Sequence, residues 1–114
     1  MNLVESIIKN GGVTLDMNGK TVQHTSGYYV SIAAIRTLPV NKLTALRIRN
    51  DLFLLKALYG NIKNRYLGLW INDGVVYVDV SVNVKRKWYA MGLGKVHGQK
   101  AIWDCKNQRE WEVK

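Results

Sequence analysis

The sequence predicts an α+β domain, with a mainly antiparallel sheet of hairpins packed with one long helix and one or two short helices. Asn18-Gly19 and Asn72-Asp73-Gly74 each separate segments of alternating residues, which is typical of β-hairpins. Valines at every second position over Val76–Val84 describe a strand with one buried and one wet face. The stretch 42–59 instead carries apolar residues at helical spacing.

The remaining elements of the first half follow from local patterns. Apolar residues three and four apart predict a short helix, and β-branched and aromatic residues predict strands. Asn41 is expected to cap the long helix, because its side-chain oxygen can accept a backbone N–H that has no partner inside the helix. The predicted elements are a helix over Leu3–Lys9, a hairpin of Val13–Met17 with Lys20–Val22, a strand over Tyr28–Ile32 and the helix over Lys42–Tyr59.

One stripe of the long helix is expected to face the core, with charged residues on the remaining arc. The stripe consists of Leu43, Leu46, Phe53, Leu54, Ala57 and Leu58. The charged arc consists of Arg47, Arg49, Asp51 and Lys56. Gly60 is expected to end the helix.

The second half is predicted to hold two hairpins around a short helix. They are Tyr66–Ile71 with Val76–Val84, a helix over Lys85–Lys95, and Ala101–Cys105 with Arg109–Val113. Opposite the valines, three aromatic residues share a face: Tyr66, Trp70 and Tyr77. They could form a platform on which bases stack or could pack beneath a helix, and we favour packing.

Length and composition indicate one domain over residues 1–114. Its 47% apolar content is enough for a core without metal or disulfides. Cys105 is the single cysteine and is expected to be a small buried apolar residue, which fits a reducing compartment. No signal peptide or membrane span is apparent, so we expect a protein of the bacterial cytoplasm that does not bind a membrane.

Charge is the most informative bulk property. Seventeen Lys and Arg against eight Asp and Glu give a net charge of +9, which favours nucleic acid or an acidic protein as partner. Six cations and one acid lie in residues 42–65, and five cations and no acid lie in residues 80–103. The expected binding residues are Arg47, Arg49, Lys63, Arg65, Lys85, Arg86, Lys87, Trp88, Lys95 and Lys100. Trp88 could stack on a base beside the cations, or it and Tyr89 could belong to the core, which we favour.

No catalytic or metal-binding constellation is predicted, and no cofactor. His24 and His97 lack metal-ligand spacing, and one cysteine does not complete a zinc site. Asp79 and Asp104 could in principle act as paired carboxylates in hydrolysis. The favoured interpretation is that each accepts hydrogen bonds from a nearby turn or an adjacent strand.

Three blocks of the sequence resemble a group of small accessory proteins of bacteriophages and other mobile elements of Gram-positive bacteria. The blocks are Ser26–Ile32, Tyr66–Ile71 continuing through Val76–Ser81, and Ala90 with Gly94 followed by Gly98–Asp104. Members usually carry an acidic, alanine-rich helix where this chain has Lys85-Arg86-Lys87-Trp88, so a different partner is expected. The resemblance implies no catalytic residues. It implies a setting in which inhibitors of host defence, such as anti-CRISPR proteins, are common.

The leading hypothesis is therefore a non-enzymatic accessory protein that binds nucleic acid or a host nuclease–guide-RNA complex. The alternative is an interaction module for an acidic host protein, without nucleic-acid contact, and a small nuclease is the third hypothesis. The sequence leaves the oligomeric state open.

Overall fold

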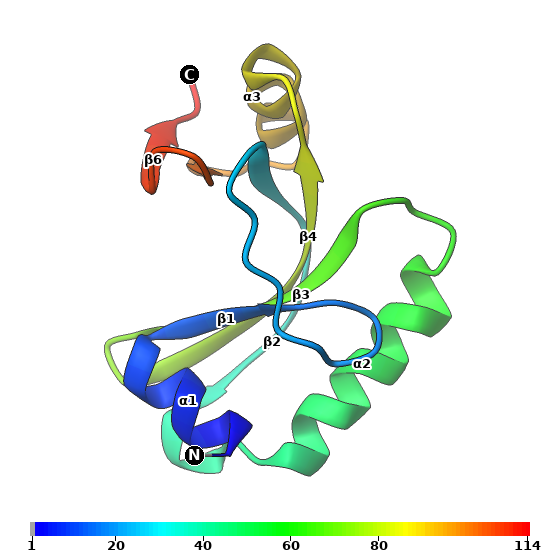
Figure 1. Cartoon of the computed structure of the whole chain (residues 1–114), viewed down its shortest axis with the longest axis vertical. Coiled ribbons are helices and arrows are strands. Elements are labelled where there is room, and N and C mark those ends of the chain that lie inside the picture. The colour runs from blue at the N-terminus through cyan, green and yellow to red at the C-terminus, as the bar shows by residue number, and fades with distance from the viewer. Residues whose placement is uncertain (1) are drawn as a thin grey trace.

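A computed structural model describes residues 2–114, in which three α-helices accompany a six-stranded sheet (Figure 1). The strand order is β1-β3-β4-β2-β5-β6, and every neighbouring pair is antiparallel. The predicted α+β class with a mainly antiparallel sheet is confirmed. The elements are α1 (Leu3–Asn10), β1 (Gly12–Leu15), β2 (Tyr28–Pro39), a 3₁₀ turn (Val40–Lys42), α2 (Ala45–Tyr59), β3 (Arg65–Asn72), β4 (Val75–Val84), α3 (Lys87–Val96), β5 (Ala101–Asp104) and β6 (Arg109–Glu112).

The sheet is strongly curled, and two irregularities in β2 explain the curl (Figure 1). Pairing with β4 shifts register between Ser31 and Ala33 and again between Ala34 and Arg36, so Ile32 and Ile35 are extra residues. An extra residue of this kind bends the strand and increases its twist. The curl divides the molecule into two halves, each with its own core.

The two halves are drawn at the bottom and the top of Figure 1. The lower core gathers Ile7 of α1, Ile48 and Leu55 of α2, and residues of β1 to β4. The upper core gathers Val30, Val82, Ile102 and Ala90 of α3. All three helices pack on the face of the sheet that carries the even-numbered valines of β4. None of the helices in residues 2–114 is long and apolar enough to cross a membrane.

The predicted start of α2 was wrong by three residues. Thr44, not Asn41, caps the helix, and its hydroxyl accepts a hydrogen bond from the backbone N–H of Arg47 at 3.2 Å. Residues 40–42 form a 3₁₀ turn instead, and Leu43 is extended and only 6% exposed. Burying Leu43 in the lower core separates the turn from the helix.

The stripe predicted to bury α2 was also wrong. Leu46, Phe53 and Leu58 are 62%, 70% and 68% exposed, whereas Ile48, Asp51 and Leu55 face the core. The helix carries apolar residues on both sides, so their spacing alone does not choose the buried one. Asp51 can lie on the buried side because a guanidinium nitrogen of Arg36 on β2 approaches its carboxylate to 2.7 Å.

The first predicted hairpin is reduced to a turn. Asp16 accepts hydrogen bonds at 2.9 Å from the backbone N–H groups of Asn18 and Lys20, but only one bridge, from Leu15 to Thr21, follows. The second arm is therefore not a strand. The next strand, β2, is longer than predicted: it continues past Ile32 to Pro39, seven residues beyond its predicted end.

The other two hairpins and the short helix α3 are confirmed within a few residues. The predicted packing of the aromatic face beneath a helix was wrong, because every described helix lies on the opposite face. On this helix-free face Trp70 and Tyr77 stack on each other with ring centroids 4.4 Å apart, and Trp70 is 46% exposed.

Candidate functional site

A groove of about 380 Å³ opens between the two halves on the helix-bearing side. One wall is the end of α2 and the connection to β3, and the other is α3. Its floor includes Ile32, which packs against both cores. The lining residues are Ile32, Tyr59, Ile62, Lys63, Asn64, Val82, Asn83, Val84, Tyr89, Leu93 and His97.

The groove combines an apolar floor with a cationic and aromatic rim and contains no acidic residue. Tyr89, Leu93 and His97 follow at intervals of four residues, so they form one row along α3. Tyr89 is 51% exposed, and Lys63 faces this row from the opposite wall. A flat apolar or aromatic group could lie against the floor while an anionic group met the lysine.

Arg65 helps to hold the connection that forms the first wall. Its guanidinium donates a hydrogen bond to the backbone carbonyl of Ile62 at 2.6 Å and contacts the sulfur of Met17. The Asn83 N–H donates to the carbonyl of Asn64 at 3.1 Å and ties the same wall to the floor. Arg65 therefore positions the wall, and Lys63 is the cation that this wall presents.

The basic cluster before α3 spreads in several directions. Lys87 lies over the ring of Trp111, with its nitrogen 3.2 Å from the centroid, and Arg109 covers the same ring at 3.9 Å. Burial lowers the pKa of the imidazole of His24, in the loop before β2, and the nearby positive charge of Lys85 lowers it further. Arg86 is the N-cap of α3, where the backbone is extended, and it is not among the residues that line the groove.

The other predicted residues of this stretch lie away from the groove. Lys95 is two residues beyond Leu93, and this spacing points it to the far side of α3. Both Trp88 and Tyr89 are exposed, Trp88 by 72%, and they pack edge to face. The prediction that both belong to the core was wrong.

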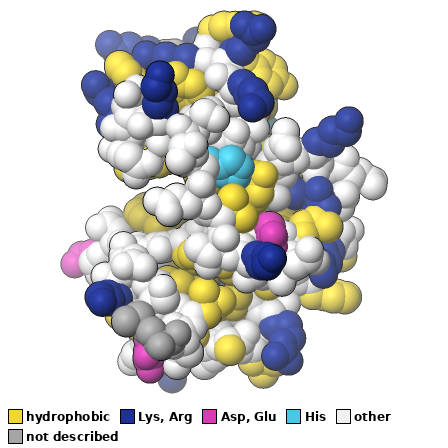
Figure 2. Space-filling model, in the orientation of Figure 1, with side chains coloured by type: hydrophobic (Ala, Val, Ile, Leu, Met, Phe, Trp, Pro, Cys, Tyr) yellow, Lys and Arg dark blue, Asp and Glu magenta, His cyan; other side chains and the backbone are white. Residues whose placement is uncertain are grey.

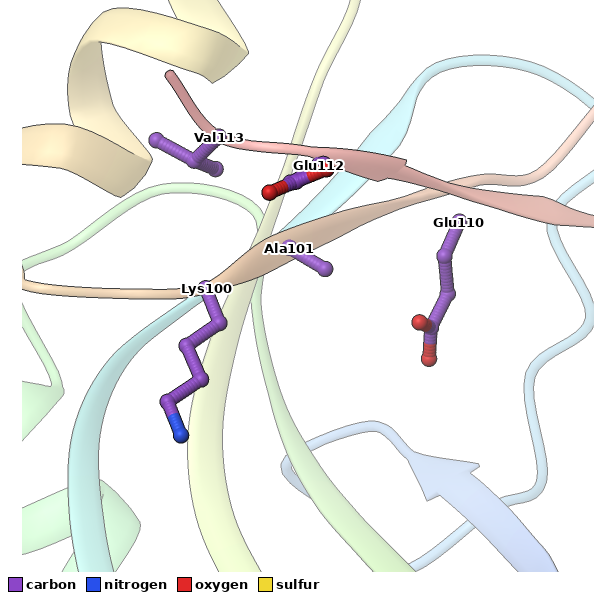
Figure 3. A pocket seen from close by; sticks show the side chains of 5 residues that line it. All are labelled: Lys100, Ala101, Glu110, Glu112 and Val113. Carbon is purple, nitrogen blue, oxygen red and sulfur yellow. The ribbon is translucent and has the colours of Figure 1, made fainter.

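Lys100 lines a different, wide-open hollow of about 540 Å³ on the β5–β6 hairpin (Figure 3). Lys100 and Glu110 project from the same side of the hairpin, and Glu112 also lines the hollow (Figure 3). Two carboxylates against one ammonium make this hollow a poor site for phosphate.

Arg47 and Arg49 lie on the first turns of α2, whereas the groove begins at Tyr59 on its last turn. A 15-residue helix is about 22 Å long, so these two arginines are remote from the groove. Of the predicted binding residues only Lys63 lines the groove, so the structure does not bring the cations of the two basic stretches together there.

The positive charge of the surface is largely uncompensated. Within residues 2–114, Arg36 and Asp51 form the one ion pair closer than 4.0 Å. Lys and Arg side chains crowd the upper half and the edge over α2 in Figure 2, and acidic side chains are sparse on this face. The surface potential is therefore positive over much of the molecule.

The two carboxylates considered for hydrolysis do not form a pair. Asp79 lies on the helix-free face and accepts a hydrogen bond from Ser81 at 3.1 Å, and burial raises the pKa of its carboxyl. Asp104 is paired by register with Tyr28 on the opposite face and accepts hydrogen bonds from the β5–β6 turn. In residues 2–114 no three His, Cys, Asp or Glu side chains gather as a metal site would require.

Apart from Lys63, none of the lining residues was predicted to bind, and the missed ones include Tyr89, His97 and Ile62. Tyr89 was assigned to the core, which was wrong, whereas His97 was assigned to a loop and does lie in the turn directly after α3, as its C-cap. The spacing of four from Tyr89 to Leu93 to His97 is the signal that could have joined them.

Comparison of the chain with protein-family models, with curated proteins and with solved structures found no match.

Proposed function

We propose that this protein is a small, basic, non-enzymatic accessory protein of a phage or mobile element that binds nucleic acid. We further propose that it acts in the cytoplasm of the bacterial host, where it inhibits a defence nuclease by holding its guide RNA, as anti-CRISPR proteins do. The observation that carries the proposal is the acid-free groove between the halves, with Tyr89 and Lys63 on opposite walls.

In this proposal an unpaired base enters the groove and packs against Tyr89, while a flanking phosphate meets Lys63. Base–aromatic stacking tolerates any base, and cations along a groove attract the backbone. The volume of about 380 Å³ is that of a small-molecule pocket, so it suits one or two unpaired bases better than a duplex. The net charge of +9 supplies long-range attraction to the strand.

The test is the affinity for a fluorescently labelled single-stranded RNA, measured by anisotropy between 50 and 200 mM salt. About three to six phosphate contacts would weaken binding roughly 20- to 300-fold over that range. Tyr89→Ala is expected to weaken binding about tenfold through lost stacking. Lys63→Ala is expected to reduce the salt slope by about 0.7, the share of one phosphate contact on a single strand.

Lys100→Ala is the matched control, because it removes the same charge beside Glu110 and Glu112. Binding that ignores salt, or that falls equally in Lys63→Ala and Lys100→Ala, would refute the groove as the binding site. A host protein retained after nuclease treatment, with no RNA affinity in the purified chain, would instead support the interaction module for an acidic partner.

A further inference from the structure

The outer face of α2 is apolar and bare. Leu46 is 62% exposed, Phe53 70% and Leu58 68%, although all three are large apolar side chains. No described element packs on them, since the residues of α2 in the lower core and packed against it are Ile48, Leu52, Leu55 and Tyr59. We call the exposed set Leu46, Phe53 and Ala57 the α2 outer face, and Leu58 lies on its flank.

The α2 outer face has the geometry of a helix that pairs with another helix. Phe53 follows Leu46 by seven residues and Ala57 follows it by eleven, and both intervals are close to whole numbers of turns. These three residues therefore form one row along the helix, whereas Leu58 lies about 120° around the helix from Leu46, on the flank that also carries Arg47. A row of this kind is what an amphipathic helix meets when it lies along another.

The row has basic edges. Arg49 and Lys56, also seven residues apart, run along one side of it, and Arg47 lies on the other. All three side chains are exposed. The one acidic residue of α2, Asp51, is 1% exposed and paired with Arg36 on the buried side. The α2 outer face is thus apolar in the middle and positive at its margins.

This charge pattern indicates which kind of molecule binds the α2 outer face. Two copies of α2 laid side by side would bring arginine and lysine against arginine and lysine, and like charges in contact disfavour pairing. A nucleic acid would match the charge but would gain nothing from Leu46 and Phe53. A membrane surface favours a helix with one broad apolar half and one polar half, whereas α2 is apolar on its buried side as well.

We infer that the α2 outer face docks an amphipathic helix of a partner protein, with leucine-like residues on Leu46, Phe53 and Ala57 and with Asp or Glu opposite Arg47, Arg49 and Lys56. The apolar row supplies the contact area and the charges set orientation and partner choice. This surface shares no residue with the groove, so it operates whether or not the groove binds RNA.

The probes are two synthetic helical peptides with leucine at the first and fourth positions of each heptad. One carries glutamate at the flanking positions and the other carries lysine. The acidic peptide is expected to bind the full chain in a fluorescence titration, and the basic peptide is not. Phe53→Glu is expected to weaken binding of the acidic peptide at least about tenfold. Because Phe53 is exposed, circular dichroism should show an unchanged fold.

A charge swap gives the sharper readout. Arg49→Glu with Lys56→Glu should lose the acidic peptide and gain the basic one. Lys106→Glu with Lys114→Glu, a variant of equal net charge in the upper half, should keep the preference of the wild type. Equal loss in both double variants would overturn the inference, because attraction would then follow net charge alone.

Two other occupants are outcomes of the same experiment. Cosedimentation with phosphatidylserine vesicles that depends on Phe53, without peptide binding, would assign the face to a membrane and overturn the inference. A dimer in sedimentation velocity that Phe53→Glu dissolves would assign it to a second copy and overturn it equally.

Discussion

Each half of the molecule buries one carboxylate, and the two are stabilised differently. Asp51 in the lower half is 1% exposed and meets one guanidinium, that of Arg36, which is itself 33% exposed. Asp104 in the upper half is 2% exposed and accepts four hydrogen bonds, between 2.8 and 3.1 Å long. Their donors are the backbone N–H groups of Lys106 and Asn107, the Asn107 amide and the Trp111 indole.

The acidities of the two groups differ accordingly. Burial raises the pKa of Asp51, and the charge of Arg36 offsets only part of that effect. The hydrogen bonds from Trp111 and Asn107 lower the pKa of Asp104 to about 2. Several fixed donors therefore stabilise a buried negative charge better than one cation that is partly in water. Because the two networks share no residue, we expect the loss of either one to act mainly on its own half of the molecule.

The largest expected effect is that of Asp104→Ala. It removes the acceptor for four donors and leaves the β5–β6 turn and Trp111 unsatisfied. We expect the melting temperature to fall by about 15 °C. Hydrogen exchange measured by mass spectrometry should speed up in β5 and β6 far more than in α2. Equal acceleration in α2 would contradict the independence of the two halves.

Breaking the ion pair between Arg36 and Asp51 should have a smaller effect on stability, and the effect should depend on which partner is removed. Arg36→Ala leaves Asp51 buried without a partner, and we expect a loss of about 2 to 3 kcal/mol in the free energy of unfolding at pH 7. Asp51→Ala leaves an arginine that can turn toward water, and we expect about 1 kcal/mol.

Urea unfolding of both single variants and of the double variant measures the coupling between the two side chains. The prediction fails if Asp51→Ala is the more harmful of the two.

The same two carboxylates show what the sequence could and could not predict. The partners of Asp104 lie within seven residues of it, so its bonding to a nearby turn could be predicted from local pattern and is confirmed. Asp51 was assigned to the polar arc of α2, because its partner lies fifteen residues away on a strand. The direction of the Arg36 side chain depends on the two register shifts in β2, and the local sequence does not predict these shifts.

The candidate site, too, could be predicted only as far as local sequence determines it. The excess of cations in residues 42–65 and 80–103 is visible in the sequence. Which of them line a groove depends on how α3 is rotated and on contacts such as that of Lys87 with Trp111. The floor residue Ile32 is an extra residue of β2, so its place between the halves follows from tertiary structure alone.

The two carboxylates should contribute to the pH dependence of stability with opposite signs. The folded pKa of Asp104 lies below the unfolded value of about 3.9, so its contribution is present above pH 4 and is lost as pH falls toward 2. The folded pKa of Asp51 is raised, so the native state holds its proton longer and stability falls as pH rises above about 4.

Urea midpoints between pH 2 and 6 test this prediction. Asp104→Asn should flatten the acid limb of the profile, and Asp51→Asn should reduce the slope above pH 4, where Asp79, whose pKa burial also raises, supplies the remainder. A profile that neither substitution changes would show that other groups control it.

The smallest effect concerns Cys105, which reports on the upper half without altering stability. It is 2% exposed, and burial is the main reason that its pKa is raised to about 11. At pH 8 its thiolate fraction is roughly two hundredfold below that of an ordinary thiol with a pKa near 8.5, so iodoacetamide should label the native chain at least that much more slowly than the unfolded one. Asp104→Ala should restore much of the labelling rate, because it loosens the turn next to Cys105. Arg36→Ala should leave the labelling rate of Cys105 unchanged, since it acts on the lower half. Fast labelling of Arg36→Ala at a temperature where it remains folded would show that the two halves open as one cooperative unit.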